Sequence, residues 1–260
     1  MPTATRDGVS LHYDTEGDGE TVAFVSDVGY GAWQWGWQHR AVAGPRESLV
    51  WDLRGTGRSD APPGPYDVDA LAADFDAVLA DADVSRAHVV GAGLGGMVAL
   101  RYAREYGRAR SLTLLCTAAS GDAVDADALR ALHPEDGADD ALRASLSGAF
   151  TPAFLAAQPE LGGDIVGWRR EEDADSAAVD AQLAAVEGFD AGPLYELPMP
   201  TLVCWGVDDP VVAPDAARRL AEALPRGTGE AVEGRHLCHI EHSRAVSERL
   251  LAHIEEAGDA

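Results

Sequence analysis

The sequence predicts an α/β fold in which a mostly parallel central sheet is flanked by helices on both faces. Short runs of β-branched residues alternate with longer segments in which apolar residues recur three and four positions apart. At 260 residues and 46% hydrophobic composition, the chain can form one large domain, or two small ones, around a fully buried sheet.

Each element is placed by its own local pattern. Strands are expected at residues 9–13, 21–26, 48–51, 87–91, 111–116, 200–205 and 229–232. The first two are expected to pair antiparallel at one edge of the sheet. Helices are expected at residues 68–82, 94–106, 214–224 and 243–256.

The strand pattern disappears between residues 121 and 197. Alanine-rich, acidic and helix-prone segments replace it. We therefore expect a helical lid inserted over one end of the sheet at residues 121–197. Residues 1–120 and 198–260 then form the α/β core.

The charge is strongly negative. The formal net charge is −24, and all 20 cationic residues are arginine. A dense acidic surface without lysine suits molar salt, where screening makes self-repulsion tolerable, so we hypothesise a halophilic source. An ordinary acidic protein from a GC-rich genome remains the alternative. Nucleic-acid partners are disfavoured because a phosphate backbone requires a cationic surface.

The chain offers no signal of export or membrane insertion. No apolar run approaches the roughly 20 residues that span a bilayer, and the amino terminus lacks a signal-peptide pattern. Cys116, Cys204 and Cys238 form a sparse, odd set that implies no disulfide framework. We expect a cytoplasmic protein with no membrane partner.

Several motifs occur together in a specific order along nearly the whole chain. The segment 88–100 reads His-Val-Val-Gly-Ala-Gly-Leu-Gly-Gly-Met-Val-Ala-Leu. The other motifs are Trp33-Gln34-Trp35 with Gln38, residues 51–60 (WDLRGTGRSD) with Pro63 and Tyr66, residues 205–210 (WGVDDP), and Gly234-Arg235-His236 with Glu241. With these motifs the chain resembles the α/β-hydrolase superfamily, in particular its esterase, enol-lactonase and C–C hydrolase branch.

The resemblance implies an acid and a base from the nucleophile–acid–histidine order of such folds. Asp209 is similar in position to the acid, since it follows the strand that ends near Gly206. His236 is similar to the base, because it precedes the last helix. Asp208 is the competing acid, one position earlier.

The nucleophile is missing. The family's elbow reads Gly-x-Ser-x-Gly, and here Gly93 stands at the serine position and Ala92 at the usual histidine. Glycine has no side chain that can attack, so an acyl-enzyme cannot form at Gly93. Gly91 and Gly95 keep the small residues that allow the sharp turn.

A second departure lies after the strand at 21–26. Relatives carry His-Gly there, whereas this chain reads Ser26-Asp27-Val28-Gly29. An Asp27 carboxylate would oppose an oxyanion unless it points away or is protonated. The backbone N–H groups of Leu94 and Val28 remain the expected oxyanion donors, because every non-proline residue supplies them.

Two routes would rescue catalysis. Ser26, Cys116 or Cys238 could act as a relocated nucleophile, since all lie near the carboxyl edge of the sheet. Alternatively, His236 with Asp209 could act as a general base on water or on a substrate proton.

Two other site types fit short motifs. Gly91-x-Gly93-x-x-Gly96 matches a dinucleotide fingerprint, but no acidic residue ends the following strand. His236, His239 and His242 with Glu241 have the spacing of a metal site, although the segment spans a loop-to-helix junction. We expect neither a cofactor nor a metal.

The sequence leaves catalysis open. We expect an α/β-hydrolase-fold protein that acts on a small ester, lactone or organic acid without a serine nucleophile. The alternative is a catalytically inactive protein that binds a ligand or a partner through the retained scaffold. The sequence predicts no oligomeric state.

Overall fold

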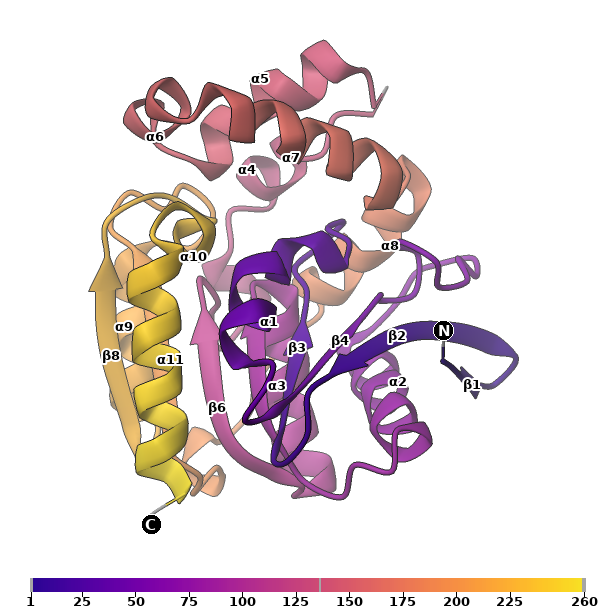
Figure 1. Ribbon diagram of the computed structural model, residues 1–260, viewed down its shortest axis with the longest axis vertical. Coiled ribbons are helices and arrows are strands. Elements are labelled where there is room, and N and C mark those ends of the chain that lie inside the picture. The colour runs from indigo at the N-terminus through magenta and orange to yellow at the C-terminus, as the bar shows by residue number, and fades with distance from the viewer. Residues whose placement is uncertain (1, 136, 259–260) are drawn as a thin grey trace.

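The computed structural model describes residues 2–135 and 137–258, and its centre is one mixed sheet (Figure 1). The strand order is β1-β2-β4-β3-β5-β6-β7-β8. β1 and β2 run antiparallel to their neighbours, and the remaining pairs are parallel. The strands are β1 (Thr3–Arg6), β2 (Val9–Glu16), β3 (Thr21–Val25), β4 (Glu47–Trp51), β5 (Ala87–Ala92), β6 (Ala109–Leu115), β7 (Thr201–Gly206) and β8 (Gly227–Val232).

The expected pairing of the first two predicted strands was wrong. β2 pairs with β1 and β4, whereas β3 lies between β4 and β5. Asp7 and Gly8 adopt positive φ angles of 50° and 80°, which close a tight β1–β2 hairpin. All residues of β3 are buried, so this strand belongs at the centre of the sheet, where both faces are covered.

Helices cover both faces of the sheet. α2 (Val68–Asp81), α3 (Leu94–Tyr106) and α9 (Pro214–Ala223) bury their apolar residues in the larger core cluster. α1 (Gly36–Val42) and α11 (Ser243–Gly258) pack on the opposite face, where Val42 and Leu250 join Phe24 in a second cluster. The predicted helices at 68–82, 94–106, 214–224 and 243–256 are confirmed within two residues at each end.

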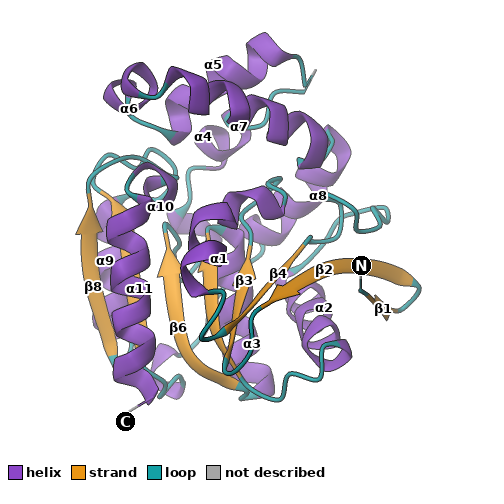
Figure 2. Cartoon of the chain, in the orientation of Figure 1, coloured by secondary structure: helices purple, strands orange, loops and turns teal. Residues whose placement is uncertain are grey.

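The regular elements described between β6 and β7 are all helical. They are η2 (Gly121–Ala123), α4 (Ala126–Ala131), α5 (Asp139–Ala149), α6 (Pro152–Ala157), α7 (Pro159–Glu172), α8 (Ser176–Glu187) and η3 (Leu194–Glu196). Of these, α4, α5, α6 and α7 lie above the carboxyl ends of the central strands (Figure 2). The predicted boundaries of the lid at 121 and 197 stay a prediction. Among the described residues, no helix is long and apolar enough to cross a membrane.

Candidate active site

The sharp strand-to-helix turn is intact although its serine is absent. β5 leads into α3 through Gly93, whose φ and ψ are 47° and −115°. A Cβ atom at Gly91 or Gly95 would collide with nearby backbone atoms, so the turn needs these small residues. The turn therefore still directs the amide of Leu94 toward the carboxyl edge of the sheet.

His236 and Asp209 meet at that edge. His236 lies in the loop before α10 (Cys238–Glu241), and its Nδ1 lies 2.9 Å from Asp209 Oδ2 and 3.0 Å from Oδ1. Asp209 Oδ1 also accepts hydrogen bonds from the amides of Val211 (2.8 Å) and Val212 (3.1 Å), which fix the carboxylate. Asp208 is exposed, so Asp209 is the carboxylate that contacts His236.

The Asp27 carboxylate occupies the centre of the site. Its Oδ2 lies 2.8 Å from His236 Nε2. Its Oδ1 accepts hydrogen bonds from the backbone amides of Val28 (2.7 Å) and Leu94 (2.8 Å). The two amides expected to form an oxyanion hole thus converge on one oxygen atom, and that atom belongs to the protein itself.

A side chain at position 93 would need the space that the Asp27 carboxylate occupies. A Cβ atom built on Gly93 would overlap the carboxylate of Asp27. The positive φ of Gly93 adds a second penalty for any side chain. Position 93 must therefore be glycine while Asp27 adopts this conformation.

The two carboxylates hold His236 as a cation. Burial lowers the pKa of His236, but Asp209 and Asp27 outweigh burial and raise that pKa well above its ordinary value. Both ring nitrogens face carboxylate oxygens and can satisfy them only by donating, which requires the doubly protonated ring. The site is a buried Asp209–His236–Asp27 ion cluster with side chains that are at most 1% exposed.

Little space remains beside this cluster. The adjoining cavity has a volume of about 10 Å³, which is room for at most about one water. Apolar side chains close it: Met97, Val124, Leu129, Val186, Val211 and Val212. An ester or lactone has no room beside Asp27 in this conformation.

The lid fastens the loop that carries Asp27. The amide of Gly29 donates to Oε1 of Gln182 on α8 (2.7 Å), and the amide of Ala174 donates to the carbonyl of Gly29 (2.8 Å). Trp33 in η1 (Ala32–Trp35) donates its indole N–H to Asp173 (2.8 Å). These contacts tie the lid to Gly29 and Trp33, which lie two and six residues beyond Asp27.

A buried arginine braces the lid next to this junction. Arg169 pairs with Asp173 at 2.7 Å and donates to the Leu132 carbonyl and the Ser145 hydroxyl. Its guanidinium also lies 5.1 Å from the ring centre of Tyr30. The three hydrogen-bond partners all lie within residues 121–197, so these charge-assisted bonds join segments of the lid to one another, and the contact with Tyr30 links the arginine to the core.

The relocated nucleophiles considered from sequence are engaged elsewhere. Ser26 accepts a hydrogen bond from the Trp35 indole at 3.1 Å. The thiol sulfurs of Cys116 and Cys238 lie 3.6 Å apart and are buried. The hydrogen bond to Cys238, together with burial, raises the pKa of Cys116 well above the usual value. A protonated thiol is a poor nucleophile.

The dinucleotide and metal motifs do not assemble their sites. Asp27 accepts from the Leu94 amide that a pyrophosphate would need at the start of α3. The ring centre of buried His239 lies 5.2 Å from that of Trp35, and Glu241 accepts a hydrogen bond from the amide of Thr151, so the histidine motif does not converge. Within the part of the chain that the structure describes, the one close set of possible metal donors is Cys116, Asp209 and His236.

Comparisons with known proteins identify relatives of this chain. A family model described as the alpha/beta hydrolase fold matches residues 45–243. The chain is 26% identical over 255 residues to 3-oxoadipate enol-lactonase 2 of Acinetobacter baylyi, covering 96% of this chain and 95% of the relative. It is 32% identical over 248 residues to a putative carbamate hydrolase of Variovorax paradoxus, covering 92% and 91%.

Solved structures share the architecture. An enol-lactonase from Burkholderia xenovorans has a TM-score of 0.87 at 24% identity, covering 98% of this chain and all of its own. A hydrolase from Pseudomonas aeruginosa has a TM-score of 0.85 at 27% identity, covering 96% of each chain.

Proposed function

This chain belongs to the α/β-hydrolase fold family, and we propose that it is a member that binds a small molecule and does not hydrolyse esters through a covalent intermediate. One observation carries the proposal: Asp27 accepts hydrogen bonds from both oxyanion amides and from His236 at once. The donors that would stabilise a developing oxyanion are therefore already used. Gly93 supplies no attacking atom.

The general-base route predicted from the sequence is disfavoured by the same contacts. A general base must offer a free lone pair at the operating pH. His236 Nε2 instead faces Asp27, and the raised pKa of the ring keeps its proton in place. Asp209 then stabilises the imidazolium form of His236.

The relatives suggest the chemical class of the ligand. Their names describe a 3-oxoadipate enol-lactonase and a putative carbamate hydrolase. We infer that a small ester, lactone or organic acid is the ligand class, recognised without turnover.

Turnover and labelling test the proposal together. We expect 4-nitrophenyl acetate hydrolysis at the background rate, and no labelling by a fluorophosphonate probe, at the salt concentration where the protein is folded. Labelling of any serine would contradict the proposal, as would a covalent adduct on Asp27 identified by mass spectrometry. Turnover without labelling would instead favour general-base catalysis by His236.

A double variant tests the arrangement of the site. Changing Asp27→Gly together with Gly93→Ser removes the internal carboxylate and supplies a hydroxyl in the same volume. We expect fluorophosphonate labelling at position 93 in this variant. The single variant Asp27→Gly is the matched control, because it frees the amides without adding a nucleophile.

A further inference from the structure

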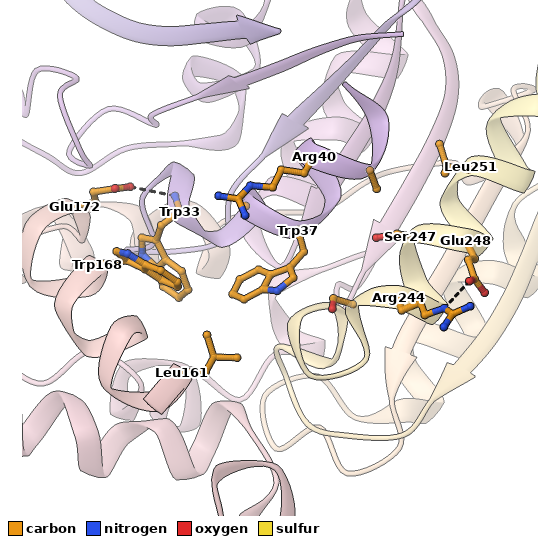
Figure 3. A pocket seen from close by; sticks show the side chains of 13 residues that line it. Trp33, Trp37, Arg40, Leu161, Trp168, Glu172, Arg244, Ser247, Glu248 and Leu251 are labelled. Carbon is orange, nitrogen blue, oxygen red and sulfur yellow. Dashed lines mark hydrogen bonds and ion pairs between the residues drawn. The ribbon is translucent and has the colours of Figure 1, made fainter. Parts of the chain in front are cut away.

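A large aromatic groove lies apart from the closed site. It has a volume of about 910 Å³ and lies between α1, α7 and α11 (Figure 3). None of its lining residues lines the small cavity beside Asp27. Its volume falls within the roughly 300–1,000 Å³ range of small-molecule sites.

Three of the chain's six tryptophans form one wall of the groove. The ring centres of Trp33 and Trp168 lie 6.3 Å apart with planes tilted by 32°. Trp37 meets Trp168 edge-on, with centres 6.1 Å apart. Trp37 and Trp168 remain partly exposed and offer an aromatic surface to a ligand, and Trp33, which is 7% exposed, supports this surface from behind. Such a surface favours a planar or acyl apolar body, because aromatic rings bury large areas at little entropic cost.

One cation at the groove has no partner among the residues that the structure describes. Arg40 on α1 is exposed, and Figure 3 shows its side chain on the same side of the groove as Trp33 and Trp37. Among residues 2–135 and 137–258, no carboxylate lies within ion-pair distance of Arg40 and no hydrogen bond satisfies it. The neighbouring Arg244, in contrast, pairs with Glu248 at 2.8 Å. In a chain with 44 acidic residues, an unpaired guanidinium beside an apolar wall is available for an anion.

The acidic group on the same wall is already engaged. Glu172 accepts a hydrogen bond from the Trp33 amide at 3.0 Å, and the Trp33 indole donates to Asp173. These contacts fix the wall and leave Arg40 as the free charged donor. Its planar fork matches a carboxylate in a bidentate arrangement.

We propose that this groove binds an amphipathic carboxylate, with its aromatic or acyl body on Trp33, Trp37 and Trp168 and its carboxylate on Arg40. The inference deepens the proposed function by placing the ligand outside the closed centre. Turnover assays test the loss of hydrolysis, whereas binding titrations test the groove, so the two can fail separately.

A series of probes with the same apolar body and different charges tests the ligand class. Tryptophan fluorescence and calorimetry follow titration with 3-phenylpropionate, 3-phenyl-1-propanol and 3-phenylpropylammonium, which share one body and differ in charge. We expect saturable binding in the order carboxylate, alcohol, ammonium, with about a tenfold preference for carboxylate over alcohol. The preference should shrink as salt increases, since Arg40 is exposed.

Single-residue variants test which residues of the groove contact the probes. Arg40→Gln should weaken 3-phenylpropionate about tenfold and leave the alcohol unchanged. Arg219→Gln is the matched control, because Arg219 is an exposed arginine outside the groove. Trp37→Ala should weaken all three probes, whereas Asp208→Asn, at an exposed position outside the groove, should change none. The proposal is overturned if no probe saturates, if the alcohol or ammonium binds as tightly as the carboxylate, or if Arg40→Gln leaves 3-phenylpropionate binding unchanged.

Discussion

The carboxylate of Asp27 lies in the space that a side chain on Gly93 would need. The two departures that the sequence shows separately are therefore one structural arrangement. Glycine at 93 makes room for the carboxylate, and the carboxylate in turn satisfies the histidine that a serine would contact and the amides that would otherwise bind an oxyanion. An aspartate in the oxyanion loop and a glycine at the elbow are expected to depend on each other.

Gly93→Ser alone should destabilise the protein by about 1–3 kcal/mol, because it overpacks a filled site. Chemical denaturation at fixed salt measures this change. Combining Gly93→Ser with Asp27→Gly should cost less than the sum of the single changes, since the collision disappears. Additive costs in the double-mutant cycle would show that the two positions are independent.

Asp27→Ala should be more damaging, at about 3–5 kcal/mol, because it leaves a buried imidazolium and two buried amides without their acceptor. The same denaturation experiment applies. Asp208→Ala is the control, since Asp208 is exposed and its change should stay within about 0.5 kcal/mol. Equal effects of the two variants would contradict a structural role for Asp27.

Acid should destabilise the fold through histidines that are buried in the neutral form. Burial lowers the pKa of His239 to about 3 and that of His88 to about 4. A depressed histidine pKa gives stability that is complete above the unfolded value of 6.5 and is lost as pH falls below it. We expect the denaturant concentration at the unfolding midpoint to decrease as the pH is lowered from 6.5 to 4. His239→Phe should reduce that slope, and an unchanged slope would exclude His239 as a contributor.

His236 has the opposite effect on the pH dependence of stability, and this effect appears at alkaline pH. Burial alone would lower its pKa, but the carboxylates raise that pKa well above 6.5. Its stabilising contribution is complete below 6.5 and is lost as pH rises through the folded value. Stability should therefore decline again at alkaline pH, and Asp27→Asn should move this decline to lower pH.

Salt should stabilise the chain if its acidic composition reflects a halophilic source. A net charge of −24 repels itself, and raising ionic strength from 0.1 M to 1 M shortens the screening length from about 10 Å to about 3 Å. We expect the melting temperature to rise by about 5 °C or more over this range. Sucrose at equal osmolality is the control, and an equal rise in sucrose would point to exclusion effects in place of charge screening.

The elements with strong local patterns could be predicted from the sequence. The buried strands, α2 and α3 follow from periodicity, and the meeting of Asp209 with His236 follows from motif order. The β1–β2 hairpin was not predicted, because its sequence signal is a short Asp7-Gly8 turn next to a four-residue strand. Pairing of β2 with β4 depends on long-range packing that local pattern does not encode.

The role of Asp27 could not be predicted in the same way. The sequence showed the carboxylate in the oxyanion loop and the missing side chain at Gly93, but only their distance in space joins them. The available signal was the coincidence of an extra acid with a lost side chain at two positions of one site. The aromatic groove depends on Trp168 of the lid, which lies far in sequence from Trp33 and Trp37.

The protonation state of His236 tests the central claim most directly. Nitrogen-edited NMR of ¹⁵N-histidine-labelled protein at pH 8 should show both ring nitrogens of His236 protonated, and Asp27→Asn should lower the pH at which the ring loses a proton. A neutral His236 ring at pH 7 in the folded wild-type protein would contradict the account, because the Asp27 carboxylate could not then hold the site closed as described.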